Sequence, residues 1–112
     1  MPSFSRGEVV MAPFPYEEDR TIVKMRPCLI LGVDEKRSRF LAAKITTTEV
    51  RAWWGIPLSA GTADMISGMI LRPSWVDLHR REWIPFSDCA FRIGRIRPDL
   101  FDDQIMARLR GL

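Results

Sequence analysis

The chain has 112 residues, of which 46% are hydrophobic and 28% charged, and it carries a net charge of +3. This length fits a single domain over residues 1–112, and the composition is too apolar for a disordered chain. No apolar run reaches the ~18–20 residues of a membrane span, and Met1 to Arg6 lack an apolar signal segment. We therefore expect a cytoplasmic protein with no membrane partner.

The cysteines and the arginines give further, weaker indications. Cys28 and Cys89 lie far apart in the sequence, and without a secretory signal they are predicted to be reduced thiols in the core. Most of the cations are arginine, whose planar guanidinium can donate two hydrogen bonds to one phosphate. A GC-rich genome produces the same bias, so composition alone does not indicate nucleic-acid binding.

The first half of the chain has the pattern of short strands separated by turns. A strand over 7–11 is predicted to end at Pro13-Phe14-Pro15, because proline cannot donate to a sheet ladder. A loop is predicted over 16–25. The continuously apolar segment 27–33 predicts a strand that is buried on both faces, and a charged turn joins it to a strand over 39–46 in an antiparallel hairpin.

The second half continues this pattern and ends in a helix. Strands are predicted over 54–58, 68–71 and 75–78, with a marginal strand over 83–86. Residues 89–93 fit either a last strand or the entry to a helix.

The C-terminal segment is the clearest helix in the sequence. Pro98 suits a first helical turn, and Phe101, Ile105 and Leu109 recur every four residues as one apolar stripe. Short strands followed by one amphipathic helix predict a mainly β protein, a small SH3-like antiparallel β-barrel with a C-terminal helix.

Several kinds of chemistry are excluded or disfavoured by the residues present. His79 is the single histidine, so one chain cannot form a two-histidine acid–base ribonuclease site. There is no Cys/His cluster at zinc spacing and no glycine-rich phosphate loop of the Walker type. The acidic run Glu17-Glu18-Asp19 is more typical of a solvated surface than of a metal site. We therefore expect neither a metal nor a cofactor.

A guanidinium and a hydroxyl are predicted to meet at one end of the hairpin. Arg26 immediately precedes the buried strand, and Thr46 ends the next one. In an antiparallel pair the start of one strand lies beside the end of the other, so these two groups would form a phosphate-sized donor site. In the alternative interpretation, Arg26 pairs with the acidic run at 17–19 and the threonines only cap a strand.

The order and spacing of several motifs resemble the MazF/PemK family of bacterial toxins. The similar segments are Arg6-Gly7-Glu8 in a first strand, Arg26-Pro27 before an apolar strand, and the strand that ends at Thr46. Residues 67–76 and 93–96 resemble the later strands and the approach to the closing helix. The resemblance covers nearly the whole chain.

This resemblance implies a metal-independent endoribonuclease toxin that cuts single-stranded RNA at a short specific sequence, leaving a 2′,3′-cyclic phosphate and a 5′-OH. It also implies a homodimer and a cognate antitoxin that blocks the site with an acidic tail. The family's catalytic residues map onto Arg26 and Thr46, with Thr47 as a one-residue alternative. Arg72 matches a supporting arginine, and Ser74 stands where an aspartate would follow it.

RNA recognition requires aromatic rings for stacking and cations for the backbone. The candidates lie in the loop before Arg26 and in the segment after Thr46: Tyr16, Arg20, Lys24, Arg51, Trp53 and Trp54. For the two tryptophans the alternative is that one belongs to the core and the other to a dimer interface.

Two other functions fit the same barrel. One is a module that binds nucleic acid or an antitoxin without cutting, and Ser74 in place of an acidic residue favours it. The other is a toxin that poisons a protein target, as gyrase-directed toxins do. Retention of both Arg26 and Thr46 favours the ribonuclease, because a toxin that binds a protein target has no need of that pair. Fold alone does not separate these functions.

Overall fold

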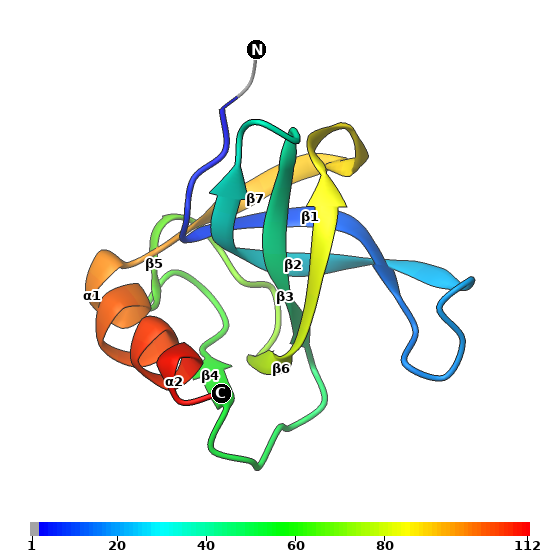
Figure 1. Cartoon of the computed structure of the whole chain (residues 1–112). Helices are drawn as coiled ribbons and strands as arrows, with labels where there is room; N and C mark the ends of the chain where they lie inside the picture. The colour runs from blue at the N-terminus through cyan, green and yellow to red at the C-terminus, as the bar shows by residue number, and fades with distance from the viewer. Residues whose placement is uncertain (1–2) are drawn as a thin grey trace.

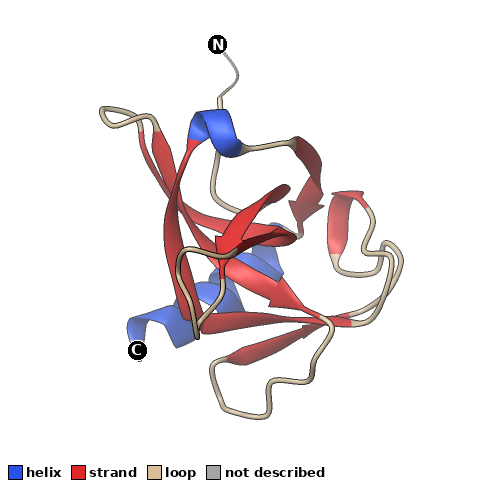
Figure 2. Ribbon diagram, turned by 90° about the vertical axis from the view of Figure 1, so that its right-hand side faces the viewer, coloured by secondary structure: helices blue, strands red, loops and turns tan. Residues whose placement is uncertain are grey.

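The computed structural model describes residues 3–112. Met1 and Pro2, which belong to the N-terminal segment predicted to lack a signal, lie outside the described residues. Seven antiparallel strands form one curled sheet in the order β4-β6-β3-β2-β1-β7-β5 (Figures 1 and 2). This half-barrel confirms the predicted fold class. The strands are β1 (Glu8–Pro15), β2 (Val23–Asp34), β3 (Arg39–Thr46), β4 (Gly55–Leu58), β5 (Met65–Gly68), β6 (Ser74–Pro85) and β7 (Phe91–Ile96).

The C-terminal helix covers one face of the sheet (Figure 1). It runs without a break through α1 (Pro98–Leu100), the π-helical segment η2 (Phe101–Met106) and α2 (Ala107–Arg110). The helix begins at Pro98 as predicted, and its apolar stripe packs against the sheet: Phe101 and Ile105 are buried, and Leu109 is partly buried. A short 3₁₀ turn, η1 (Phe86–Asp88), links β6 to β7.

Both faces of the sheet are covered by apolar side chains. Successive residues of a strand point to opposite faces, so β2 supplies Leu29 and Leu31 to the core beneath the helix, and Cys28 and Ile30 to a second core. Phe4 and Phe86 help to cover the second core. The prediction that this strand is buried on both faces is therefore confirmed. The β2–β3 hairpin is also confirmed, with β3 at the predicted bounds.

The prediction that the prolines end the first strand is wrong, because β1 continues to Pro15. On one side β1 pairs with β2 along its length, but on the other side β7 pairs with it only as far as Met11. The Tyr16 N–H donates to Ile22 O, so by alternation Pro13 and Pro15 face the side that β7 has left. On that side no neighbouring strand requires the N–H groups that the two prolines lack. The extended pairing also shortens the predicted loop, since β2 begins at Val23.

Three predicted strands in the second half have the wrong bounds. A strand is expected at 68–71, but the observed strand, β5, ends at Gly68. The backbone of Gly68 leaves the extended conformation with φ +72, and beyond it Ile70 makes an isolated bridge to Gly61. The two strands expected at 75–78 and 83–86 form one strand, β6. The charged segment between them stays in the sheet because a bulge against β3 absorbs the extra residues and because its side chains find partners across the structure.

The Glu8 carboxylate joins the first strand to the last. Its side chain is buried, accepts hydrogen bonds from Arg92 Nη1 at 2.8 Å and Ser5 N at 2.7 Å, and lies 4.0 Å from Arg95. This pairing gives the Arg-Gly-Glu motif of the sequence a structural role. Both cysteines are free thiols, as expected, although only Cys28 is fully buried. Within residues 3–112 no helix is long and apolar enough to cross a membrane.

Candidate functional site

Arg26 and Thr46 lie at the same end of adjacent strands. The β2–β3 ladder ends where Cys28 pairs with Lys44, and two residues further on Arg26 and Thr46 are the next opposed positions on that face. Beyond this point each strand is held from its outer side: Arg26 pairs with Ala12 of β1, and Thr46 pairs with Trp75 of β6. Both positions are thus fixed by neighbouring strands at the open end of the hairpin.

A polar cleft of about 220 Å³ opens beside Arg26. Arg26 from β2, Lys44 from β3 and Arg80 from β6 give it three cations. The loop between β1 and β2 adds Glu17 and Glu18, together with Tyr16 and the adjoining Pro15. Arg80 Nη1 lies 2.9 Å from Glu17 Oε1. Glu17 therefore pairs with Arg80, and among the ion pairs within residues 3–112 none involves Arg26.

The pKa of Lys44 reflects its burial and the charges around the cleft. Partial burial lowers the pKa of its ammonium group, and the charges of Arg26 and Arg80 lower that pKa further. The carboxylates of Asp77 and Glu17 act in the opposite direction. The net pKa shift is downward, and burial is its largest cause.

The Thr46 hydroxyl is oriented by the backbone that follows it. Its Oγ1 accepts the Thr48 N–H at 3.1 Å. With one lone pair engaged in this way, the hydroxyl proton is free to be donated to a group outside the strand. Thr46 shares a face with Arg26 and Lys44 but does not itself line the cleft.

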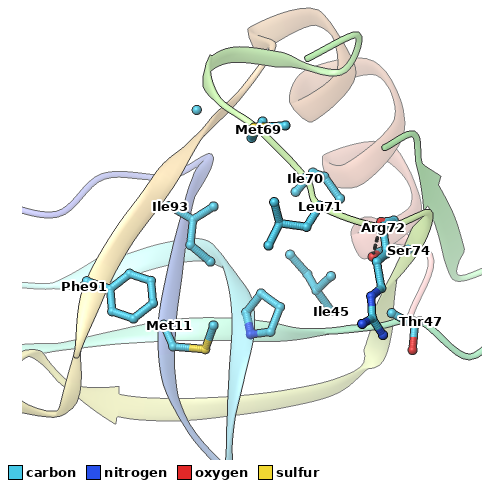
Figure 3. Close-up of a pocket in the computed structure, with 12 residues that line it drawn as sticks. Met11, Ile45, Thr47, Met69, Ile70, Leu71, Arg72, Ser74, Phe91 and Ile93 are labelled. Carbon is cyan, nitrogen blue, oxygen red and sulfur yellow. Dashed lines mark hydrogen bonds between the residues drawn. The ribbon is translucent and has the colours of Figure 1, made fainter. Parts of the chain in front are cut away.

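A second and larger hollow of about 600 Å³ opens on the other face of the same strands (Figure 3). Pro27, Ile45 and Thr47 line it, each one residue away from a group on the cleft face. Its walls are mostly apolar, and Arg72 and Ser74 lie at the same edge as Thr47 (Figure 3). Ser74 is buried, and its hydroxyl donates to the Arg72 carbonyl at 2.8 Å.

Strand alternation thus divides the predicted catalytic residues between two faces. Arg26 and Thr46 lie on the cleft face, whereas Thr47, Arg72 and Ser74 line the apolar hollow. If Thr47 replaced Thr46 as the catalytic residue, the hydroxyl would lie on the opposite face of the sheet, because successive side chains point in opposite directions.

The predicted RNA-binding residues are also dispersed. Tyr16 lines the cleft with Arg26, whereas Arg20 forms a 2.6 Å ion pair with Glu82 of β6. Lys24 is exposed on β2, and Arg51 is exposed and pairs with Glu49 at 3.0 Å.

The two tryptophans face different surroundings. Trp54 packs against the core beneath the helix, and its ring lies 4.9 Å from that of His79. Trp53 is half-exposed beside Gly111, at the end of the C-terminal helix.

The sequence pattern did not single out Lys44, Arg80 or Glu17 for this cleft. Arg80 lies in β6 with a side chain that is only 16% exposed. For Lys44 a signal was present: a lysine two residues before Thr46 must share its face of the strand. No local signal identifies Glu17, because its contact with Arg80 joins residues 63 positions apart (80 − 17).

Residues 5–111 match the family model of PemK-like, MazF-like toxins of type II toxin–antitoxin systems. The chain belongs to this family. A search among curated proteins found no match.

Known structures share the fold at low sequence identity. The toxin MazF-mt6 of Mycobacterium tuberculosis superposes with a TM-score of 0.64 at 20% identity, covering 91% of this chain and 93% of that one. A mycobacterial endoribonuclease in complex with its cognate antitoxin superposes with a TM-score of 0.68 at 18% identity, covering 98% and 97%. A further mycobacterial endoribonuclease gives 0.65 at 18% identity, covering 100% and 95%.

Proposed function

We propose that this protein is the toxin of a type II toxin–antitoxin system and a metal-independent endoribonuclease that cuts single-stranded RNA. Membership of the toxin family and the fold shared with endoribonucleases support this function. The observation that carries it is the placement of Arg26 and Thr46 at one end of adjacent strands, beside a cleft lined by cations.

RNA supplies its own nucleophile for this reaction. The 2′-OH loses its proton, and its oxygen attacks the adjacent phosphorus in line with the bond to the 5′-oxygen. That bond breaks, the 5′-oxygen takes up a proton, and the products are a 2′,3′-cyclic phosphate and a 5′-OH. Neither a bound water nor a metal ion is required, so the protein needs to align the backbone and stabilise negative charge.

Arg26 and Thr46 are assigned to that charge. The Arg26 guanidinium can donate two hydrogen bonds to the non-bridging oxygens, and the free proton of Thr46 can supply a third. Arginine keeps its proton at neutral pH, so Arg26 stabilises charge and is not the acid that protonates the leaving group.

The test is a digest of a long single-stranded RNA in excess EDTA, with mapping of the new ends. Wild-type protein should give discrete cuts with 5′-OH ends. Arg26→Ala and Thr46→Val should each lower the rate by about 10²–10³-fold, the loss expected for one preorganised donor. Arg37→Ala, at the exposed turn of the same hairpin, is the matched control and should cut normally.

Two results would overturn this assignment. If Arg26→Ala cuts at the wild-type rate, the site lies elsewhere; activity that EDTA removes and magnesium restores would exclude the metal-free mechanism. If folded wild-type protein does not cut RNA at all, the non-catalytic binding module and the protein poison become the leading functions.

Two protein partners belong to this proposal. The first is a cognate antitoxin, supported by the related endoribonuclease that is in complex with its own antitoxin. The second is another copy of the chain. Exposed apolar residues beside the large hollow support a homodimer: Met69 is 48% exposed, Leu71 83% and Phe91 56%.

A further inference from the structure

The cleft beside Arg26 contains two cations that the reaction described above does not use. Lys44 and Arg80 line it together with Arg26, and the three come from the neighbouring strands β3, β6 and β2. A sheet fixes such positions more firmly than a loop does. The spacing along β3 also directs Lys44 to the same face as Thr46.

Arg80 is held in place before any ligand arrives. Its side chain is only 16% exposed, and its ionic partner is Glu17, whose side chain is 74% exposed. An ion pair with one partner in water is weak and screened by salt. A phosphate can therefore displace Glu17 from a guanidinium that is already positioned.

The loop carboxylates balance the cleft in the free protein. Arg26, Lys44 and Arg80 contribute three positive charges, and Glu17 and Glu18 contribute two negative charges from the loop between β1 and β2. Both glutamates are exposed, whereas the cations are partly buried on the sheet. Displacement of the loop carboxylates would leave a concentrated positive site of a size that suits a phosphate.

We propose that Lys44 and Arg80 complete, with Arg26, a binding site for a backbone phosphate of single-stranded RNA, and that Glu17 occupies this site until the phosphate displaces it. This inference rests on the proposed function and deepens it. Burial is the first cause that lowers the pKa of Lys44, and the charges of Arg26 and Arg80 lower that pKa further. The contribution of the two arginines agrees with such a cluster, because a phosphate anion would relieve the mutual repulsion.

Binding can be measured separately from cutting. The probe is a fluorescein-labelled single-stranded RNA of mixed sequence that is 2′-O-methylated at every position and so lacks the nucleophile. Phosphate contacts do not depend on sequence, so the cut sequence need not be known. Fluorescence anisotropy at several salt concentrations gives the affinity and its salt dependence.

Removal of one cation should weaken binding in a defined way. Lys44→Gln and Arg80→Gln should each bind about tenfold less tightly, the value of one charge-assisted hydrogen bond. The slope of log affinity against log salt should decrease by about 0.7 for each cation removed. Lys44→Arg should restore most of the affinity. Lys36→Gln, in the exposed turn at the far end of the hairpin, should bind almost as wild type.

Glu17→Gln should have the opposite effect, which a damaged fold would not produce. Binding should become about threefold tighter at low salt, the equivalent of losing one competing surface ion pair. Glu35→Gln in the far turn removes the same charge and should leave binding nearly unchanged. Circular dichroism shows whether Arg80→Gln folds. If it does not fold, the Glu17→Gln measurement still tests the proposal.

The outcomes separate this inference from the proposed function. If wild-type protein cuts RNA but Lys44→Gln and Glu17→Gln bind as wild type, the phosphate site is wrong and the ribonuclease stands. If the variants behave as expected but no cutting is seen, the site stands and the catalytic proposal fails. If the wild-type protein neither binds nor cuts, both are overturned.

Discussion

Cys28 follows Arg26 by two residues on β2, and its environment suppresses its reactivity. The side chain is fully buried, and its Sγ donates a 3.4 Å hydrogen bond to the Arg26 carbonyl. Burial raises the pKa of this thiol to about 12, although the nearby charge of Arg26 opposes the increase. The thiolate, which is the reactive form, is therefore scarce at neutral pH.

This predicts that iodoacetamide distinguishes the two cysteines. At pH 8 the half-buried Cys89 should be alkylated first, even though partial burial also raises its pKa. Cys28 should react slower by about a hundredfold or more and become reactive only on unfolding. Peptide mapping by mass spectrometry measures both rates. Equal rates in the folded protein would contradict the burial of Cys28 described above.

The alternation of side chains along a strand also divides the candidate site between the two faces of the sheet. Arg26 faces the cation cleft, and Pro27, one residue later, lines the apolar hollow. The same separation holds between Lys44 and Ile45. Sequence proximity therefore misleads within a strand, because neighbouring residues serve different surfaces.

Strands β5 and β7 meet through two glycines. A Cβ on Gly94 would overlap the Ser67 carbonyl oxygen, and a Cβ on Gly68 would overlap the Ile93 carbonyl oxygen. The two backbones approach so closely that no side chain fits between them. This contact holds β5 at the edge of the sheet, next to the apolar hollow.

Gly94→Ala should therefore destabilise the protein, whereas Gly32→Ala should not. The first substitution forces backbone atoms apart, for which we expect a loss of about 1–3 kcal/mol in the free energy of unfolding. A Cβ on Gly32 meets nothing within 4 Å. That change should be neutral or stabilise the fold by up to about 1 kcal/mol, because alanine restricts the unfolded chain. Urea denaturation of both variants provides the measurement, and equal effects would refute the contact.

At the scale of the whole molecule, the half-barrel leaves two sheet edges and one apolar hollow uncovered. Strands β4 and β5 are the ends of the sheet, and the hollow between β5 and the hairpin is lined mainly by apolar side chains. Large exposed apolar patches commonly mark sites of protein association. The proposed homodimer would cover this surface.

Leu71 provides the test of that assembly, because it is 83% exposed and points into no core. Wild-type protein should elute with twice the 12.9 kDa mass of one chain in size-exclusion chromatography with light scattering. Leu71→Glu should shift the protein toward the monomer, because a carboxylate cannot be buried in an apolar interface without a partner. Leu112→Glu, at the partly exposed C-terminus, is the control. A monomeric wild type would reject the homodimer and leave this face for the antitoxin.

Local patterns in the sequence determined much of the fold. The apolar segment of β2, the hairpin to β3 and the helix beginning at Pro98 all follow from periodicity and turn residues, which act over a few positions. Those patterns also placed Arg26 and Thr46 at one end of the hairpin, because antiparallel pairing fixes that relation.

Long-range contacts decided what the local patterns could not. The prolines of β1 are tolerated because β7 ends at Met11, and the charged centre of β6 stays extended because Arg80 and Glu82 find partners in a distant loop. The same contacts bring Arg80 and Glu17 to the cleft beside Arg26. Thus the sequence by itself determined the β2–β3 hairpin, the C-terminal helix and the Arg26–Thr46 end of the hairpin. Only the tertiary structure assembled the cation cleft, because its members come from separate strands and a loop whose proximity depends on the order and pairing of the strands in the sheet.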